Sequence, residues 1–169
     1  MTTHSVEAIV RALTAADVRY LIVGGLAVVA HGFVRFTADV DLVLDPSTEA
    51  LRRAVTALGG LGYRPRAPVA FEEFPDPEQR ARWMRDKGLT VFSLFSSEHG
   101  ATEVDLFVEP PFDFEKAYSD AVRLEVAPGV PATFVALEEL ISMKRAAARP
   151  QDLQDVAGLE ARREEGGTS

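Results

Sequence analysis

The chain has 169 residues, 47% of them hydrophobic, and carries a formal net charge of −8. Its length and composition predict a single domain with a substantial hydrophobic core. Its acidity argues against broad binding of duplex DNA, which depends on many phosphate contacts. The chain contains no cysteine, which excludes disulfides and thiolate metal sites.

The apolar residues give no sign of a membrane protein. The longest apolar stretch, from Leu21 to Ala30, is much shorter than the roughly 20 residues that cross a bilayer. The N-terminus also lacks the basic and then apolar regions of a secretory signal. We therefore expect a cytoplasmic protein without a membrane partner.

The chain begins with a predicted helix and a predicted strand. Residues 5–16 have the apolar spacing of an amphipathic helix, with Ser5 as its N-cap. Residues 20–23 have the length and β-branched content of a buried strand. Both segments are expected to pack into the core.

A glycine pair joins this strand to a second helix. Gly24 and Gly25 interrupt the apolar run, and residues 26–31 read as a short helix. Backbone N–H groups at the start of a helix bind anions, phosphate above all, so this junction predicts a phosphate site. His31 is expected to be partly buried and hydrogen-bonded, because three histidines far apart in the chain do not suggest a zinc site.

Two acidic residues open the next predicted strand, 37–44. Since side chains of a strand alternate between its faces, Asp39 and Asp41 point one way while Val40 and Leu42 point into the core. Two carboxylates this close repel by about 4 kcal/mol at an effective dielectric near 20, so they share a proton, stay hydrated or bind a cation. Oxygen ligands on a rigid strand suit Mg²⁺; the alternative is a pair of solvated residues at a strand end.

The middle of the chain is more polar. Residues 46–58 predict a helix, and the proline-rich stretch 64–77 predicts either a functional loop, such as a lid, or a disordered segment. Residues 76–87 predict a basic helix that either faces solvent or binds phosphate. Trp83 in this helix is expected to pack in the core, although an aromatic side chain near arginines also suits stacking on a base.

Two hairpins and two helices are predicted after this point. Residues 89–95 pair with 102–108, and residues 122–126 pair with 132–135 across a Pro-Gly turn. The chain then predicts a C-terminal pair of helices.

The first C-terminal helix carries a lysine on its apolar stripe. This residue, Lys144, either snorkels to water, pairs with an acid or points towards a triphosphate. Asp152 and Asp155 lie one helical turn apart in the second helix. We expect these two acids to pair with Lys144 or with a neighbouring arginine and to hold the helices together.

The glycines and acids form a pattern that resembles the nucleotidyltransferase superfamily of the DNA polymerase β type, and most closely its small bacterial branch of AbiEii-type toxins. The resemblance rests on Gly24-Gly25 and on Arg35-x-Thr37-x-Asp39-Val40-Asp41. It covers most of the chain and implies an α+β fold, in which a mixed β-sheet is flanked by helices. The implied single domain spans 1–165, with a core over 5–135 and C-terminal helices over 137–164; residues 166–169 are expected to form a disordered tail.

The resemblance also implies a site. It implies three catalytic carboxylates that hold Mg²⁺ or Mn²⁺: Asp39, Asp41 and, on the strand 102–108, Asp105. Glu103 shares a face with Asp105 and is either a further ligand or a solvent-exposed residue. Binding of the NTP is implied for Gly24, Gly25, Arg35, Thr37 and Lys144.

The implied activity is transfer of a nucleoside monophosphate from an NTP to an acceptor hydroxyl, with release of pyrophosphate. The acceptor is left open between an RNA or tRNA end, a small molecule such as an aminoglycoside or a lincosamide-like drug, and a protein side chain. The resemblance also allows the protein to act as the toxin of a toxin–antitoxin pair, with an antitoxin protein as its partner. A second class also stays open: a catalytically inactive member that binds nucleotide or a partner protein.

Overall fold

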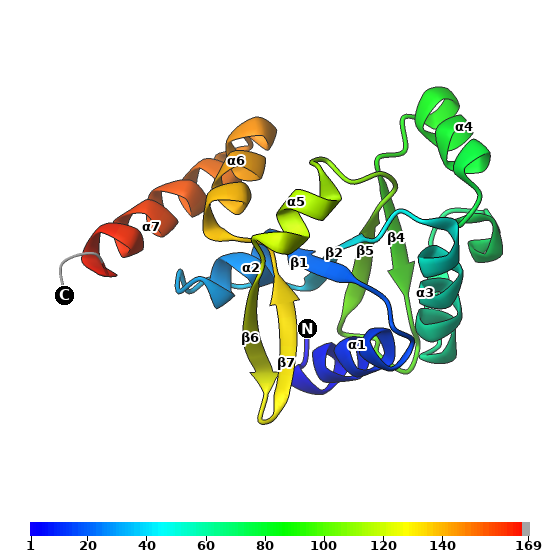
Figure 1. Ribbon diagram of the computed structural model, residues 1–169, viewed down its shortest axis with the longest axis horizontal. Coiled ribbons are helices and arrows are strands. Elements are labelled where there is room, and N and C mark those ends of the chain that lie inside the picture. The colour runs from blue at the N-terminus through cyan, green and yellow to red at the C-terminus, as the bar shows by residue number, and fades with distance from the viewer. Residues whose placement is uncertain (167–169) are drawn as a thin grey trace.

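A seven-stranded mixed β-sheet organises the structure, a computed structural model that describes residues 1–166 (Figure 1). In spatial order its strands are β3 (Arg64–Pro65), β4 (Val91–Phe95), β5 (Glu103–Phe107), β2 (Asp39–Leu44), β1 (Tyr20–Val23), β7 (Val130–Phe134) and β6 (Val122–Ala127). The helices are α1 (Thr3–Ala15), α2 (Gly24–Ala30), α3 (Thr48–Gly60), the 3₁₀ helix η1 (Phe71–Glu73), α4 (Pro77–Lys87), α5 (Phe114–Ser119), α6 (Leu137–Ala147) and α7 (Pro150–Gly166). The predicted α+β class is confirmed.

Strand β2 lies at the centre of the sheet. It pairs antiparallel with β1 and parallel with β5, and β1 continues the sheet by a parallel pairing with β7. Strands β4 and β5 form one antiparallel hairpin and strands β6 and β7 form another. Both hairpins were predicted, and both are confirmed.

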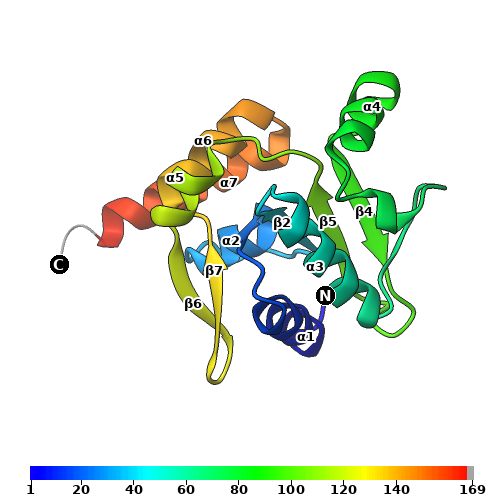
Figure 2. The ribbon, with the colours of Figure 1, turned by 45° about the vertical axis from the view of Figure 1, so that its right-hand side comes forward.

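The core follows from the apolar patterns. All four residues of β1 are buried, as a strand inside a sheet requires. In β2, Val40 and Leu42 are each 1% exposed whereas Asp39 and Asp41 are only partly buried, so the predicted alternation is confirmed. Helices α1 and α3 pack against each other and against the sheet, which closes the core (Figure 2).

Three predicted helix starts are wrong by two residues each, one of them that of α3, which begins at Thr48 and not at residue 46. Helix α1 begins at Thr3, and its N-cap is Thr2, whose hydroxyl accepts a hydrogen bond from the N–H of Ser5. Helix α2 begins at Gly24 itself, which adopts the left-handed region with φ +65°. The chain therefore turns from strand to helix without an intervening loop.

Two aromatic side chains anchor the proline-rich stretch 64–77, so it is not disordered. Its first residues form β3, and its aromatic side chains Phe71 and Phe74 are buried beside Phe92 of β4. Trp83 of α4 stacks on the same Phe92, so its predicted packing role is confirmed. Residues 64–70 are exposed or half-buried, and the functional loop stays a prediction.

The edges of the sheet are irregular. Strand β3 is only two residues long and contains Pro65. At the other edge, residues 123–125 of β6 are exposed, and the pairing of β6 with β7 is irregular between Glu125 and Ala127.

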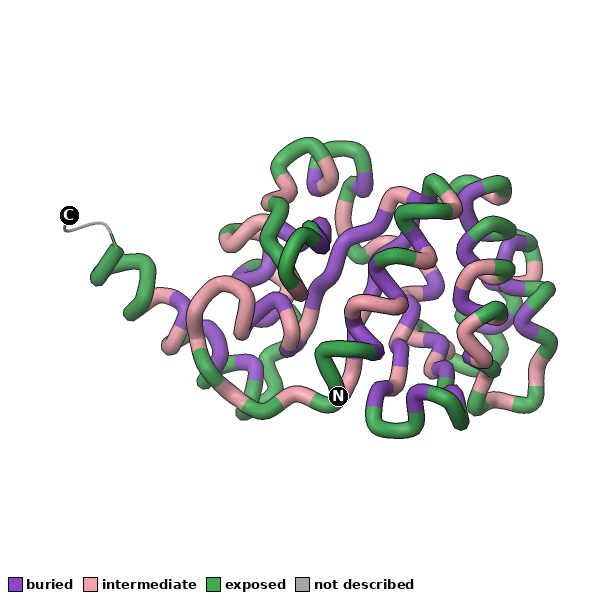
Figure 3. Tube along the Cα trace, turned by 90° about the horizontal axis from the view of Figure 1, so that it is seen from below, coloured by how far each residue is buried: buried purple, intermediate pink, exposed green. Residues whose placement is uncertain are grey.

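Helices α6 and α7 pack together beside the sheet, as predicted for the C-terminal pair. The end of α7 extends away from the rest of the molecule, and residues 161–166 are exposed (Figure 3). Gly166 still belongs to this helix, and the remainder of the predicted disordered tail, 167–169, lies outside the described residues. Among residues 1–166, no helix combines the length and apolarity needed to cross a membrane.

Candidate active site

Three carboxylates meet on one face of the central strands. Asp41 of β2 lies directly opposite Asp105 of β5 in the parallel register, and Asp39 lies opposite Glu103. Paired residues of neighbouring strands project from the same face of a sheet. The structure thus brings the three predicted acids together, although Asp105 is far from the other two in sequence.

These carboxylates line a cavity of about 620 Å³ between the sheet, the segment that precedes β2, and the C-terminal helices. The cavity wall contains every residue that the sequence predicted for the site: Gly24, Gly25, Arg35, Thr37, Asp39, Asp41, Asp105 and Lys144. The wall also contains residues that the prediction missed: Phe36, Phe107, Arg149 and Asp152 among them.

Burial and repulsion make the negative charge of this site unfavourable. Burial, and then the charges of Asp105 and Asp39, raise the pKa of Asp41 to about 6, against smaller opposing effects of Lys144 and the Gly25 N–H. Burial, and then the charges of Asp105 and Glu103, also raise the pKa of Asp39. Both aspartates therefore favour a proton or a cation beside them.

Asp105 is held by a residue that sequence analysis did not single out. The hydroxyl of Ser93 on β4 donates a hydrogen bond of 2.6 Å to Oδ1 of Asp105, which lies directly across the hairpin. Ser93 interrupts the apolar run of its strand, and this was the available signal. Glu103, predicted as either a ligand or an exposed residue, forms an ion pair with Arg66.

The donor atoms fit a hard divalent cation that arrives with a nucleotide. In residues 1–166, no three His, Cys, Asp or Glu side chains lie close enough to one another to enclose a metal ion. Mg²⁺ normally uses only one or two carboxylates and takes its other ligands from substrate phosphates and water. An open set of oxygen ligands, two of which (Asp39 and Asp41) have raised pKa values, suits that mode better than a closed structural site.

The two glycines leave room for neighbouring side chains. A Cβ atom on Gly24 would lie 2.0 Å from Oδ2 of Asp41, and a Cβ atom on Gly25 would lie 2.6 Å from Oγ1 of Thr37. The glycines therefore let the carboxylate and the hydroxyl approach the start of α2. Their predicted contact with phosphates stays a prediction.

Lys144 lies in the cavity wall but is bound to acids of α7. Its Nζ atom is 2.9 Å from Oδ1 of Asp152 and 2.9 Å from Oδ2 of Asp155, and the lysine is 7% exposed. The predicted pairing of these acids with Lys144 is confirmed. Burial alone raises the pKa of Asp152, but hydrogen bonds from Arg149 and Lys144 outweigh this effect and lower the pKa to about 2.

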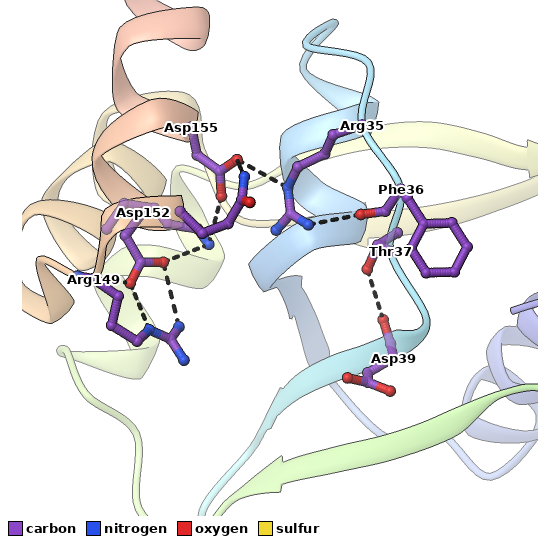
Figure 4. A network of polar contacts seen from close by, with 9 residues as sticks. Arg35, Phe36, Thr37, Asp39, Arg149, Asp152 and Asp155 are labelled. Carbon is purple, nitrogen blue, oxygen red and sulfur yellow. Dashed lines mark hydrogen bonds and ion pairs between the residues drawn. The ribbon is translucent and has the colours of Figure 1, made fainter.

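Arg35 joins the same network from the segment before β2. Its Nε atom is 2.9 Å from Oδ1 of Asp155, which is fully buried, and its Nη1 donates a hydrogen bond of 2.8 Å to the carbonyl of Phe36. The network, shown in Figure 4, contains three basic and two acidic side chains, which leaves one net positive charge at the cavity wall. The sequence prediction placed Arg35 at the nucleotide and missed its partner on α7.

His31, at the end of α2, is partly buried, and its Nε2 lies 2.8 Å from the carbonyl oxygen of Val135. The prediction of a hydrogen-bonded structural histidine is confirmed.

The fold is similar to that of three solved structures of antibiotic-modifying enzymes. A lincomycin-bound lincosamide antibiotic adenylyltransferase, LnuA, shares 13% identity with a TM-score of 0.56, over 87% of this chain and 89% of that one. ANT(2'')-Ia in complex with adenylyl-2''-tobramycin shares 15% identity with a TM-score of 0.57, over 93% and 86%. The solution structure of ANT(2'')-Ia shares 14% identity with a TM-score of 0.55, over 99% and 94%.

The chain shares the fold of these three structures. No family model matches its sequence, and no curated protein matches it. At identities this low, the similarity establishes the fold alone, and the acidic cavity beside the central strands is the candidate site.

Proposed function

We propose that the protein transfers a nucleoside monophosphate from an NTP to an acceptor hydroxyl and releases pyrophosphate. The observation that carries this proposal is the meeting of Asp39, Asp41 and Asp105 on one face of a cavity that also has a positively charged wall. Carboxylates on one side and cations on the other are the groups that a triphosphate with its metal ions requires.

Each group has a role in this proposal. The three aspartates hold Mg²⁺ or Mn²⁺ together with the triphosphate, and the bound metal supplies neutralisation of phosphate charge and a lower pKa for the attacking hydroxyl. Ser93 fixes Oδ1 of Asp105, so that Oδ2 is free to orient the acceptor hydroxyl. We assign Asp105 to the acceptor side because it borders β4, away from the start of α2.

The nucleotide side of the site lies at the start of α2. Backbone N–H groups of Gly24 and Gly25 bind terminal phosphates in this proposal. The network around Lys144 and Arg35 contributes one net positive charge, which offsets part of the charge of the triphosphate. Thr37 positions the start of β2, since its hydroxyl lies 3.5 Å from the carbonyl oxygen of Asp39.

A small cationic molecule is the acceptor that we propose first. The formal net charge of −8 and the acidic face around Asp39 and Glu103 attract cations and repel a polyanion. Two of the three solved structures reported above are described as bound to lincomycin and to adenylyl-2''-tobramycin, both small molecules. An RNA or tRNA end, and a toxin role with an antitoxin partner as in the AbiEii-type branch, are retained as the second candidate from the sequence resemblance.

The test is transfer of label from each of the four α-³²P-labelled NTPs, with Mg²⁺ or Mn²⁺, to three acceptor sets: aminoglycosides, lincosamides and total RNA. We expect labelled small molecule and pyrophosphate with the wild-type protein and neither with Asp41→Asn. Labelled RNA would support the second candidate, an RNA or tRNA end as the acceptor. A wild-type protein that releases no pyrophosphate with any acceptor would support the alternative of an inactive binding protein.

A further inference from the structure

The segment that precedes β2 alternates between half-buried and exposed side chains. Phe33 and Arg35 turn inward, whereas Val34 is 85% exposed and Phe36 is 83% exposed. Exposure of two large apolar side chains so close together is costly, because apolar surface is removed from water wherever the fold allows. The arrangement of this segment therefore needs an explanation.

Helix α7 fixes the inward side of the segment at two points. The ring of Phe33 lies against Gly158, where a Cβ atom would come within 2.4 Å of the ring carbons. Three residues earlier on the same helix, and so on the same face, Asp155 pairs with Arg35 at 2.9 Å. With Phe33 and Arg35 fixed in this way, the exposed position of Phe36 is set by the fold.

Phe36 stands at the cavity. It lines the cavity wall three residues before Asp39, and its ring projects away from the ion-pair network (Figure 4). Among the ring contacts found in residues 1–166, none involves this ring. Its carbonyl is held by Arg35, so the backbone that carries the ring is fixed. An exposed aromatic ring without ring partners, carried by a hydrogen-bonded backbone in the wall of a cavity, is suited to stacking.

We propose that Phe36 stacks on the nucleobase of the NTP. This inference rests on the proposed function. Stacking on the nucleobase is favoured over stacking on the acceptor because of where Phe36 lies. Its neighbours Thr37 and Arg35 border Gly25 at the start of α2, where the phosphates are proposed to bind. The acceptor side lies across β2, where Asp105 borders β4.

Stacking on a phenyl ring has a chemical consequence for selectivity. Every base has a π face, so a stacking residue adds affinity for all four NTPs without hydrogen-bond discrimination. Phe36 thus distinguishes a nucleotide from a bare polyphosphate and leaves the choice of base to other groups.

The experiment measures binding by calorimetry in the presence of Mg²⁺ and without acceptor. The ligands are the four NTPs and inorganic tripolyphosphate, which has the phosphates but no base. We expect Phe36→Ala to lose about five- to tenfold in affinity for an NTP and nothing for tripolyphosphate. Phe36→Trp retains the affinity, and Val34→Ala, which removes an equally exposed side chain from the same segment, leaves both ligands unaffected.

Each other outcome overturns the inference. An NTP affinity of Phe36→Ala equal to that of the wild type removes the stacking role, and so does an equal loss for tripolyphosphate, which would mean that the phosphate site was disturbed. Unchanged NTP affinity of Phe36→Ala, together with a raised KM for the acceptor in the label-transfer assay, assigns the ring to the acceptor side instead. A wild-type protein that binds neither NTP nor tripolyphosphate contradicts the proposed function itself, and this failure is distinct because it appears without any substitution.

Discussion

At the scale of single residues, the ionised Asp41 lowers the free energy of unfolding. Its pKa is about 6 in the folded protein and near 3.8 ordinarily. Between these values the folded state binds more protons than the unfolded state, so the free energy of unfolding falls as the pH rises from about 4 to 6. At neutral pH the whole cost applies, up to about 3 kcal/mol.

The substitution Asp41→Asn should therefore stabilise the metal-free protein at neutral pH. We expect the free energy of unfolding in EDTA to rise by about 1–3 kcal/mol at pH 7.5 and to change little at pH 4. Urea denaturation at the two pH values measures this. Asp45→Asn is the control with the opposite sign, because Asp45 has a lowered pKa and pairs with Arg19. An equal effect of Asp41→Asn at both pH values would show that the charge is not the cause.

The same charges predict a response to metal ions. Millimolar Mg²⁺ or Mn²⁺ together with NTP should raise the melting temperature by about 2 °C or more, because a ligand that binds only the folded state stabilises it. Metal with NTP should exceed metal alone, since phosphates supply the missing ligands. Asp105→Asn should melt normally and show no shift. A wild-type melting temperature that changes with neither metal nor NTP, added separately or together, would count against the proposed metal and nucleotide site.

Lys144 separates a structural role from a role in binding. Replacement by Met retains the packing of the stem but removes a buried cation that contacts both Asp152 and Asp155. Each acid keeps one arginine partner, so the loss should cost about 1.5–3 kcal/mol of unfolding free energy. Lys116→Met is the matched control: that lysine pairs with Asp120 on the surface, and its loss should leave the free energy of unfolding nearly unchanged.

Titration of the folded Lys144→Met protein with NTP completes the test. A loss of affinity would show that the lysine also acts on the triphosphate as a point charge. Unchanged stability would contradict the buried ion pairs described above.

At the scale of elements, α7 acts as the support of the segment that precedes β2. The substitution Gly158→Ala introduces a Cβ atom into the space of the Phe33 ring, and the overpacking should cost about 1–3 kcal/mol. Gly166→Ala in the same helix meets no atom within 4 Å and serves as the control for the intrinsic preference of alanine for helix. Urea denaturation compares the two, and a Gly158→Ala variant as stable as the control would show that Phe33 moves away at no cost.

Local patterns predicted most of the elements. The alternation in β2 located Asp39 and Asp41 on one face, and the turn residues located both hairpins, because these features depend on neighbours in sequence. The aromatic anchor of the stretch 64–77 was missed because its prolines outweighed Phe71 and Phe74, whose partner Phe92 lies further along the chain.

The site was predicted less completely than the fold. The resemblance identified residues of the cavity wall, but the pairing of Arg35 with Asp155 joins distant parts of the chain and has no periodic signal. Ser93 faces Asp105 only because β4 and β5 pair in one particular register. Such contacts follow from tertiary structure, and a single sequence gives them no distinctive pattern.

At the scale of the whole molecule, the site depends on long-range pairing. Asp41 and Asp105 are adjacent only when β2 and β5 have paired in parallel, and the other wall of the cavity comes from α6 and α7 at the C-terminus. Closing such large loops is a slow part of folding. Binding of NTP is therefore expected to report on the complete fold.

The two edges of the sheet have a consequence for how the molecule meets other chains. A strand adds to a sheet by hydrogen bonds to an unpaired, straight edge, and such edges also seed aggregation. Here β3 is too short and carries Pro65, whereas the irregular β6 exposes Arg123 and Glu125. Neither edge is a good template for an incoming strand, so the sheet resists growth into fibrils. We therefore expect a protein partner of this chain to recognise its surface side chains and not to add a strand to its sheet.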